Sequence, residues 1–418
     1  MTLLDAHNDL LPPVEPVVAD LGAGSGPAWL DAWLGTHRSD VVAWRRSLHS
    51  VPELARSEHR TTAMIKRHLM AAGLEPRTLP GGTGLVCDIG YGERCVALRA
   101  DLDALPLQED TGLPFASTVD GVSHACGHDA HTSILLGAAL ALASAPSLPG
   151  RVRLIFQPAE ELQPGGALDM VADGAMEGVE RAFALHCDPR LEVGKLGTRV
   201  GPITSACDVL EIRLTSPGGH TSRPHLTADL VEAMGLLITQ LPLLLTRQVD
   251  PRSGTVLVWG AAHAGEAANA IPQHGLLRGT LRTADHATWN ELEDKMRSLV
   301  AAVLAPLGVG YVLDHVRGVP PVVNDPRTVA LLRSAALETV GPDGVVLSPQ
   351  SMGGEDFGWF ADRLPIALAR LGTHGGGEPL DLHRGTFDVD ERAIGVGVRL
   401  MARTALLALE ADRHPAHT

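Results

Sequence analysis

Residues 151–161 read RVRLIFQPAEE, and the way this stretch ends indicates both a fold and a site. Its apolar run, Val152–Phe156, has the length of one buried β-strand. Two adjacent carboxylates, Glu160 and Glu161, follow this strand, and ligand sites of open α/β sheets lie at the carboxyl ends of their strands. Because neighbouring side chains diverge, one carboxylate can bind a metal while the other faces a substrate water. A solvated pair of glutamates in a loop is the alternative interpretation.

Similar apolar runs lie on both sides of this strand and alternate with helical patterns. Such alternation is typical of an α/β domain with a mostly parallel central sheet flanked by helices. The helical patterns are 29–74, His131–Ala145, Leu168–Gly174, Thr328–Val340 and Glu391–Ala411, and the other predicted strands are Leu85–Ile89, Cys95–Arg99, Ala182–His186 and Ala367–Leu371.

The middle of the chain has a different order of elements: strand, helix, strand, strand, helix, strand. This is the order of a ferredoxin-like α/β sandwich. The predicted segments are Asp208–Thr215, Leu226–Leu245, Gly254–Ala262, Gly275–Arg282, 287–305 and Gly310–Asp314. We therefore expect a catalytic domain built from residues 1–205 and 317–418, interrupted by a smaller inserted lid domain at 206–316. Residues 1–28, rich in Pro, Gly and Asp, are expected to form an irregular extension.

Composition narrows the possible partners and the compartment. The formal net charge of -15 argues against nucleic acid and anionic membranes, and an aromatic content of 3% argues against base stacking. Five widely spaced cysteines in 418 residues do not form a disulfide framework. The N-terminus lacks the pattern of a secretory signal, and no apolar stretch is long enough to span a bilayer. We expect a cytoplasmic protein.

Three further stretches carry metal-binding residue types. Cys126 and His128 are two residues apart, His186 ends a predicted strand, and His383 precedes the last helix. Each of them alone is also compatible with a structural role. Together with Glu161 they offer one thiolate, three imidazoles and one carboxylate, which is too many for one open tetrahedral zinc. They suit two metal ions roughly 3.5–4 Å apart. Asp103 or Asp129 could orient a ligand histidine.

Several motifs, in this order along residues 40–405, resemble those of the co-catalytic metallopeptidase and aminoacylase superfamily. Within it the chain is similar to the amidohydrolase branch that holds hippurate hydrolases, N-acyl amino acid amidohydrolases and deacetylases, and indole-acetyl-amino-acid hydrolases. The motifs are WRRSLHSVPEL (44–54), LRADLDALP (98–106), SHACGHDAHT (123–132), FQPAEE (156–161), GGHTSRPH (218–225), NAIP (269–272), GGEDF (353–357) and the segment from His383 to Glu391.

This resemblance implies roles for residues at matching positions. The metal ligands would be Cys126, His128, Glu161, His186 and His383, holding two divalent ions (Zn, Mn, Co or Ni), and Glu160 would be the general base. His220 of the insert would act in the partner subunit's active site, which implies a homodimer formed through the insert. The substrate would be held by Asn269, Arg282 and Gly354. Asp188 and Arg384 depart from the family pattern beside ligands, which puts specificity in doubt.

The implied activity is metal-dependent hydrolysis of the amide bond of N-acyl amino acids, such as N-acetyl or N-benzoyl compounds. A dipeptidase or carboxypeptidase is the first rival, but it would need a residue for a free α-amine, and none is evident. An inactive dimer that only binds acyl-amino acids is the second, and an esterase with the same metals is the third. The sequence carries no recognisable code for the acyl group or for the amino acid.

Overall fold

The computed structural model describes residues 27–378 and 380–411, which form two compact units. The first unit extends to Gly201 and includes Asn324–Pro349 and the residues from Trp359 onward. The second unit consists of Pro202–Val323 and Gln350–Gly358. The predicted extension 1–28 lies outside the described residues except for its last two. No helix among the described residues is long and apolar enough to cross a membrane.

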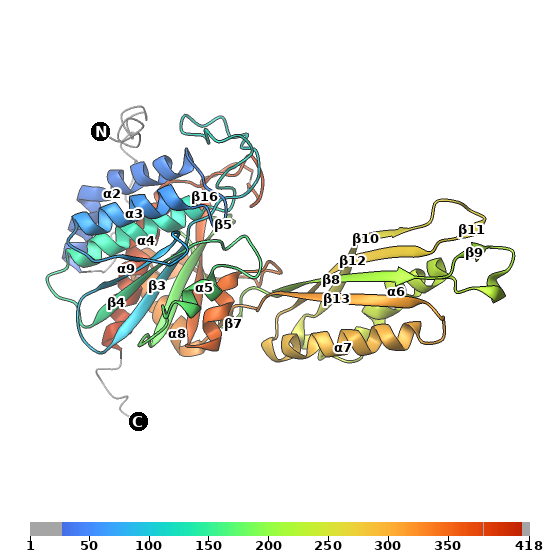
Figure 1. Cartoon of the computed structure of the whole chain (residues 1–418). Helices are drawn as coiled ribbons and strands as arrows, with labels where there is room; N and C mark the ends of the chain where they lie inside the picture. The colour runs from blue at the N-terminus through green and yellow to red at the C-terminus, as the bar shows by residue number, and fades with distance from the viewer. Residues whose placement is uncertain (1–26, 379, 412–418) are drawn as a thin grey trace, which may run out of the picture. The chain divides into compact units, whose positions relative to one another are not determined.

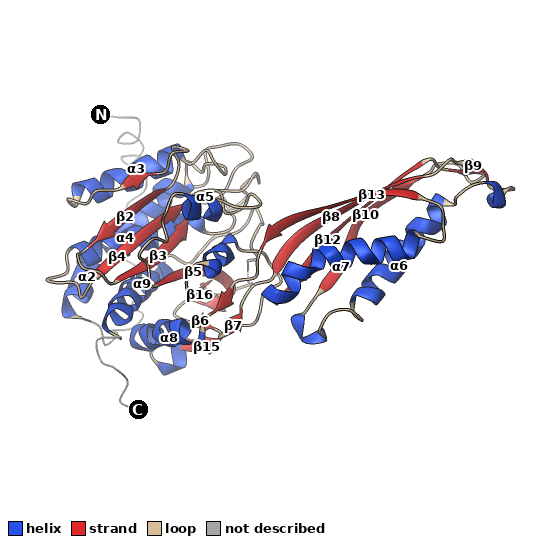
Figure 2. Cartoon of the chain, turned by 60° about the horizontal axis from the view of Figure 1, so that its bottom comes forward, coloured by secondary structure: helices blue, strands red, loops and turns tan. Residues whose placement is uncertain are grey.

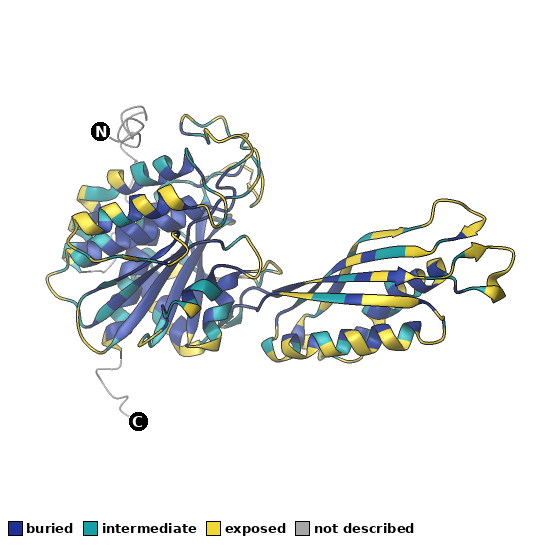
Figure 3. Ribbon diagram, viewed as in Figure 1, coloured by how far each residue is buried: buried dark blue, intermediate teal, exposed yellow. Residues whose placement is uncertain are grey.

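The first unit is built around one eight-stranded sheet in the order β1-β2-β4-β3-β5-β16-β6-β15. Its four central strands, β4, β3, β5 and β16, are parallel to one another (Figure 1). Strands β3 and β16 are buried along nearly their whole length, as expected for parallel strands covered on both faces (Figure 3). The predicted mostly parallel central sheet is confirmed. The strands are β1 (Arg77–Thr78), β2 (Leu85–Ile89), β3 (Cys95–Asp101), β4 (Arg151–Gln157), β5 (Arg181–Glu192), β6 (Leu196–Thr198), β15 (Val345–Leu347) and β16 (Ile366–His374).

Two long helices, α4 (His128–Ala143) and α9 (Arg392–Glu410), pack against the parallel strands. Helix α4 is apolar on every side and nearly all of its residues are buried, because α2 (Ala28–His49) covers it from outside. It begins three residues earlier than predicted, directly after Gly127, whose φ of 88° favours glycine. The remaining helices of this unit are α3 (His59–Ala71), α5 (Ala167–Ala172) and α8 (Pro326–Val340).

The second unit has a four-stranded antiparallel sheet in the order β10-β12-β8-β13, with α6 and α7 packed on one face (Figure 2). This arrangement is the predicted ferredoxin-like sandwich. Inward-facing positions of β8, such as Leu210 and Ile212, are buried, whereas Val209 and Arg213 are exposed. The elements are β8 (Ala206–Thr215), α6 (Leu230–Leu245), β10 (Val256–Ala264), β12 (His274–Thr283), α7 (His286–Leu304) and β13 (Gly310–Val319).

Two small sheets complete the chain. One pairs β9 (Gly219–His220) with β11 (Ala270–Ile271) within the second unit. The other pairs β7 (Gly201–Pro202) with β14 (Val323–Asn324), where the chain leaves and re-enters the first unit. Short 3₁₀ turns lie at Pro224–Leu226, Pro251–Ser253, Pro342–Gly344 and Asp356–Asp362.

Candidate metal centre

The predicted metal-binding side chains come from four separate segments of the first unit. Cys126 and His128 stand at the start of α4, Glu161 follows β4, His186 lies within β5, and His383 belongs to the loop before α9. Strand β5 continues to Glu192, so His186 is not at the strand end as predicted. The parallel strands bring their carboxyl ends to one edge of the sheet, and this is where the segments meet.

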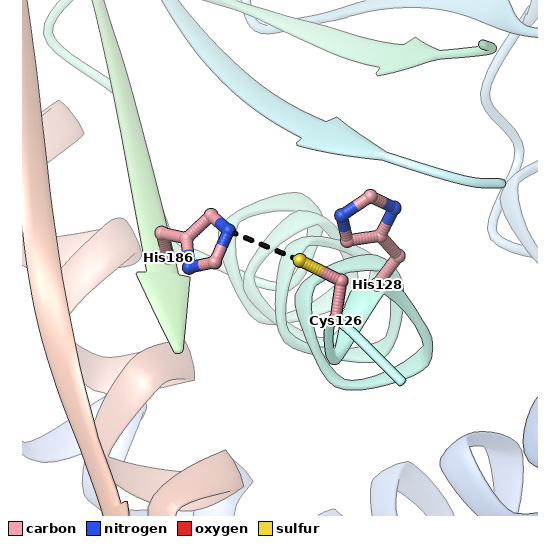
Figure 4. A group of neighbouring side chains, drawn as sticks. All are labelled: Cys126, His128 and His186. Carbon is pink, nitrogen blue, oxygen red and sulfur yellow. Dashed lines mark hydrogen bonds between the residues drawn. The ribbon is translucent and has the colours of Figure 1, made fainter. Parts of the chain in front are cut away.

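The structure brings all five side chains together, with Glu160 beside them. Potential ligand atoms lie within 4.8 Å of one another in each of three groups. The Sγ of Cys126 is 3.5 Å from the Nε2 of His186 (Figure 4). The Nε2 of His383 is 3.2 Å from the Oε1 of Glu161. Three residues each belong to two of these groups: Cys126, His128 and Glu161. The groups are Cys126/His128/His186, Cys126/Glu161/His383 and His128/Glu160/Glu161.

Hydrogen bonds leave one nitrogen of each buried histidine directed at this cluster. The Nδ1 of His128 donates to the backbone oxygen of Asp103 at 2.9 Å, and the Nδ1 of His186 donates to the oxygen of Cys187 at 2.7 Å. In the neutral form of each ring, the lone pair is therefore on Nε2. The Nε2 of His128 is buried and has no hydrogen-bond partner among the described residues. A buried polar atom without a partner is costly, and a cation bound to this nitrogen would satisfy it.

His131, the second histidine of the CGHDAH stretch, has no nitrogen left for a metal. Its Nε2 accepts the backbone N–H of Cys187 at 2.9 Å, and its Nδ1 donates to Asp101 at 2.6 Å. Asp101 is itself paired with the buried Arg99 at 2.7 Å. His131 therefore links the end of β3 to the middle of β5, and sequence spacing alone gave no sign of this role.

The charge at the centre favours a cation. Burial, followed by the nearby carboxylates of Glu161 and Glu160, raises the pKa of the Cys126 thiol well above its usual value. Burial lowers the pKa of His128, but Asp101, Asp103 and Glu161 outweigh it and raise this pKa to about 10. Without a metal, both groups would hold protons at neutral pH. A divalent cation can replace these protons, so the donor set fits a metal centre.

The backbone is strained at two points of this site. Ala159 has a φ of 54° and His383 a φ of 58°, in the left-handed region that non-glycine residues rarely adopt. Each such residue costs of order 1–3 kcal/mol, which the surroundings must offset. A bond from the N–H of His383 to the oxygen of Ala125, at 2.8 Å, ties this loop to the residue before Cys126. The strain thus occurs where two of the metal-binding segments are held in place.

A buried arginine connects two of the segments that carry the candidate ligands. Arg45 of α2 is fully buried and donates to Asp129 at 2.7 Å and to Asp388 at 2.6 Å. Asp129 also accepts from His49 at 2.8 Å. The possible role of Asp129 in orienting a ligand histidine is therefore not seen, because its carboxylate binds Arg45 and His49 instead. Arg45 connects the start of α4 to the loop after His383.

The four candidate residues of the second unit fall into two pairs. His220 and Asn269 lie together, since β9 pairs with β11 and the N–H of Thr221 donates to the oxygen of Asn269 at 3.2 Å. Arg282 and Gly354 form the other pair, because Arg282 donates to the oxygen of Met352 and is register partner of Cys207, against which Gly354 packs.

The two pairs lie at opposite ends of the four-stranded sheet. Arg282 is aligned with Cys207 at the start of β8, whereas His220 lies beyond Thr215, the last residue of β8. Eight residues of strand separate Cys207 from Thr215, a span of about 27 Å. His220 and Arg282 of one chain therefore cannot contact the same small substrate.

His220 presents a hydrogen-bond donor to the solvent. Its ring is exposed, and its Nδ1 accepts the backbone N–H of Ser222 at 3.1 Å. An accepting Nδ1 places the proton of the neutral ring on Nε2. The exposed atom is then an N–H that can donate to an oxygen.

Comparison with known proteins identifies the family. Residues 97–407 match the model of peptidase family M20/M25/M40. The chain belongs to this family. It is 33% identical to the Bacillus subtilis YXEP protein, described as a dinuclear metal-binding peptidase of the M20 family. Their structures align with a TM-score of 0.78 over 91% of this chain and 99% of that one. The resemblance inferred from the motifs is confirmed.

Two relatives with named activities are similar to this M20 member. It is 36% identical over 368 residues to the N-acetyl-L-cysteine deacetylase of Bacillus subtilis (strain 168), which covers 86% of each protein. A Rhodococcus jostii (strain RHA1) protein named "Putative glutamate--cysteine ligase 2-3" is 52% identical over 414 residues, covering 94% of this chain and 52% of that protein. The chain spans about half the length of that relative. Membership of the M20 family, with a deacetylase relative of similar length, makes the chain a hydrolase that acts on amides.

Proposed function

We propose that this M20 protein hydrolyses the amide bond of N-acyl amino acids to a carboxylic acid and an amino acid. The observation that carries the proposal is the convergence of one thiol, three imidazoles and two carboxylates at the edge of the parallel sheet. The similarity to an N-acetyl-L-cysteine deacetylase supports the substrate class. The five cysteines are all free thiols, which supports a reducing compartment such as the cytoplasm.

Two divalent metal ions would be held by Cys126, His128, Glu161, His186 and His383. The three ligand groups share members, so they could hold two ions close together. When bound, such ions polarise a carbonyl and lower the pKa of a coordinated water toward about 7. His383 is the most accessible of the five, with 53% of its side chain exposed, and it therefore lies on the side open to solvent and substrate.

Glu160 would act as the general base. Its backbone N–H is fixed, its side chain is only 9% exposed, and its Oε2 lies 3.9 Å from the Nε2 of His128. A carboxylate in this place can take a proton from the attacking water and pass it to the leaving amine. His220 of a partner subunit would donate its Nε2–H to the developing oxyanion.

Substrate selection is the test of this function. Purified protein loaded in turn with Zn, Mn, Co or Ni is expected to release free amino acids from N-acetyl, N-benzoyl or longer acyl amino acids. Dipeptides with a free α-amine are expected to react much more slowly, because no residue that recognises the amine is evident. Faster cleavage of the dipeptides would favour the peptidase alternative. Binding without turnover under every metal would favour the inactive binder, and preference for the ester analogue would favour an esterase.

The dimer can be tested through shared active sites. Chains carrying Glu160→Gln or His220→Ala are each expected to be nearly inactive. The turnover of His220→Ala should fall by about 10²-fold, because one oxyanion donor is lost. If His220 acts across the dimer, half of the randomly mixed dimers contain one intact site, and the mixture recovers about a quarter of wild-type turnover. Mixing His220→Ala with the double variant is the control and should recover nothing. Full turnover by a stable monomer would contradict the shared site.

Arg282 would hold the α-carboxylate of the substrate, because its planar fork pairs with a carboxylate and stays charged. In the structure Arg282 donates to the backbone oxygen of Met352, and the carboxylate of Asp314 is paired with Arg213. Arg282→Ala is expected to lower kcat/KM for acyl-amino acids by about 10²-fold, while amino acid amides lose much less. Arg278→Ala, on the same strand, is the matched control. Equal losses on both substrates would assign Arg282 to the fold.

A further inference from the structure

We infer that Asp103 is a positioning residue, which aims both carboxylates of the site by holding the backbone of Glu160 and Glu161. The inference rests on the proposed function for its activity readout. The geometry, however, is independent of any substrate, because it concerns the protein's own backbone.

The side chain of Asp103 binds two consecutive peptide groups. It is buried, and its Oδ1 accepts the N–H of Glu160 at 3.0 Å while its Oδ2 accepts the N–H of Glu161 at 2.9 Å. One carboxylate thus fixes both peptide planes. Because neighbouring side chains leave the backbone in different directions, fixing both planes also fixes where the two carboxylates point.

The backbone of the same residue holds a third group of the site. The oxygen of Asp103 accepts the Nδ1–H of His128 at 2.9 Å, which keeps the Nε2 of that ring directed at the cluster. Asp103 lies two residues after the end of β3. Glu160 belongs to the segment after β4, and His128 to the start of α4. A single residue therefore sets the register between a candidate base and two candidate ligands.

The bend that carries the two glutamates needs such a clamp. Ala159 is in the left-handed region, and its N–H is held from the other side by the Oε1 of the buried Glu58 at 2.8 Å. The backbone at Gly166 packs directly against this bend, because a Cβ added to Gly166 would lie 1.9 Å from the oxygen of Pro158. Two buried carboxylates, Glu58 and Asp103, thus hold three successive N–H groups. Release of one clamp would allow the strained bend to relax and would turn Glu160 and Glu161 away.

Asp103→Asn tests the clamp with a minimal change of shape. One oxygen becomes an NH₂ group, which cannot accept an N–H, so one of the two bonds must break. We expect titration with Zn²⁺ or Mn²⁺ to show metal affinity weakened by about 10- to 100-fold, as for residues that support metal ligands. With metal saturating, kcat should fall by about 10- to 100-fold with little change in KM, because misaimed groups slow the reaction rather than binding. Asp88→Asn is the control. Asp88 lies on β2 and pairs with Arg153 of β4, so this variant should retain wild-type metal affinity and kcat.

The double variant separates positioning from general damage. If Asp103 acts on turnover mainly through Glu160, Asp103→Asn should reduce the residual activity of Glu160→Gln by far less than it reduces that of the wild type. Equal factors in both backgrounds would overturn the inference, as would metal affinity and turnover within twofold of wild type. Should Asp103→Asn fail to fold, Asp103→Glu keeps the charge but displaces both acceptors by one methylene, and the same losses are expected. If neither variant folds, Asp103 serves the fold and the inference is wrong.

The metal titration also distinguishes this inference from the proposed function. Weakened metal binding in Asp103→Asn, with no hydrolysis of acyl-amino acids by the wild type, would leave the positioning role intact and reject the substrate class. Normal metal binding and turnover in Asp103→Asn, with an active wild type, would reject the positioning role alone.

Discussion

Exhaustive chelation is expected to abolish amide hydrolysis, and addition of Zn, Mn, Co or Ni is expected to restore it. The physical reason is that the pKa values of the Cys126 thiol and the His128 imidazole are raised. Without metal these ligand atoms carry protons, and the site has no Lewis acid to polarise the amide carbonyl. The measurement is turnover of an N-acyl amino acid against metal content. Full activity in metal-free protein would reject the account.

A cysteine pair provides the matched control for this result. Cys126→Ser removes the soft ligand that two of the candidate groups share, and metal affinity should fall by at least about 10²-fold. Cys95→Ser changes another buried thiol, on β3, which lies outside these groups, and it should leave the metal content unchanged. A loss of metal in both variants would mean that the effect comes from the fold.

Replacement of the base is expected to have the second large effect. Glu160→Gln should lower kcat by at least about 10²-fold while metal content stays nearly intact, because the amide keeps the shape but cannot accept the proton. Glu161→Gln changes the neighbouring carboxylate and should reduce the metal content itself. The reverse pattern would show that the roles of the two glutamates are exchanged.

The competition between protons and metal gives a pH dependence with a defined sign. The pKa of His128 in the metal-free protein is raised to about 10, so protonation opposes metal binding below that pH. Apparent metal affinity, measured by titration at several pH values, is expected to rise from pH 6 to pH 8. An affinity that is constant over this range would contradict the participation of His128 and Cys126.

The sequence predicted the architecture well where local patterns determine structure. The strand Val152–Phe156 and its neighbours are present with small extensions, because a short, mostly apolar run favours a buried strand of a covered sheet. The start of α4 was placed three residues late, since the donor pattern of residues 126–131 masked the role of Gly127 as the residue before the helix.

What the sequence could not provide is the set of contacts between distant segments. Arg45 and Asp388 are 343 residues apart, and nothing in their spacing indicates that they meet. The same holds for the separation of His220 from Arg282, because the register of an antiparallel sheet cannot be read from the order of its strands. His131 received no role from the sequence, and the structure shows that its two nitrogens connect Asp101 to the backbone of Cys187.

The central claim is that five side chains from four segments hold two metal ions. X-ray diffraction at the absorption edge of the bound metal tests it most directly. We expect two anomalous peaks roughly 3.5–4 Å apart, each with protein ligands at about 2.0–2.3 Å. The peaks should lie among the side chains of Cys126, His128, Glu161, His186 and His383. Metal bound elsewhere in active protein, or a Cys126 that contacts neither ion, would contradict the account.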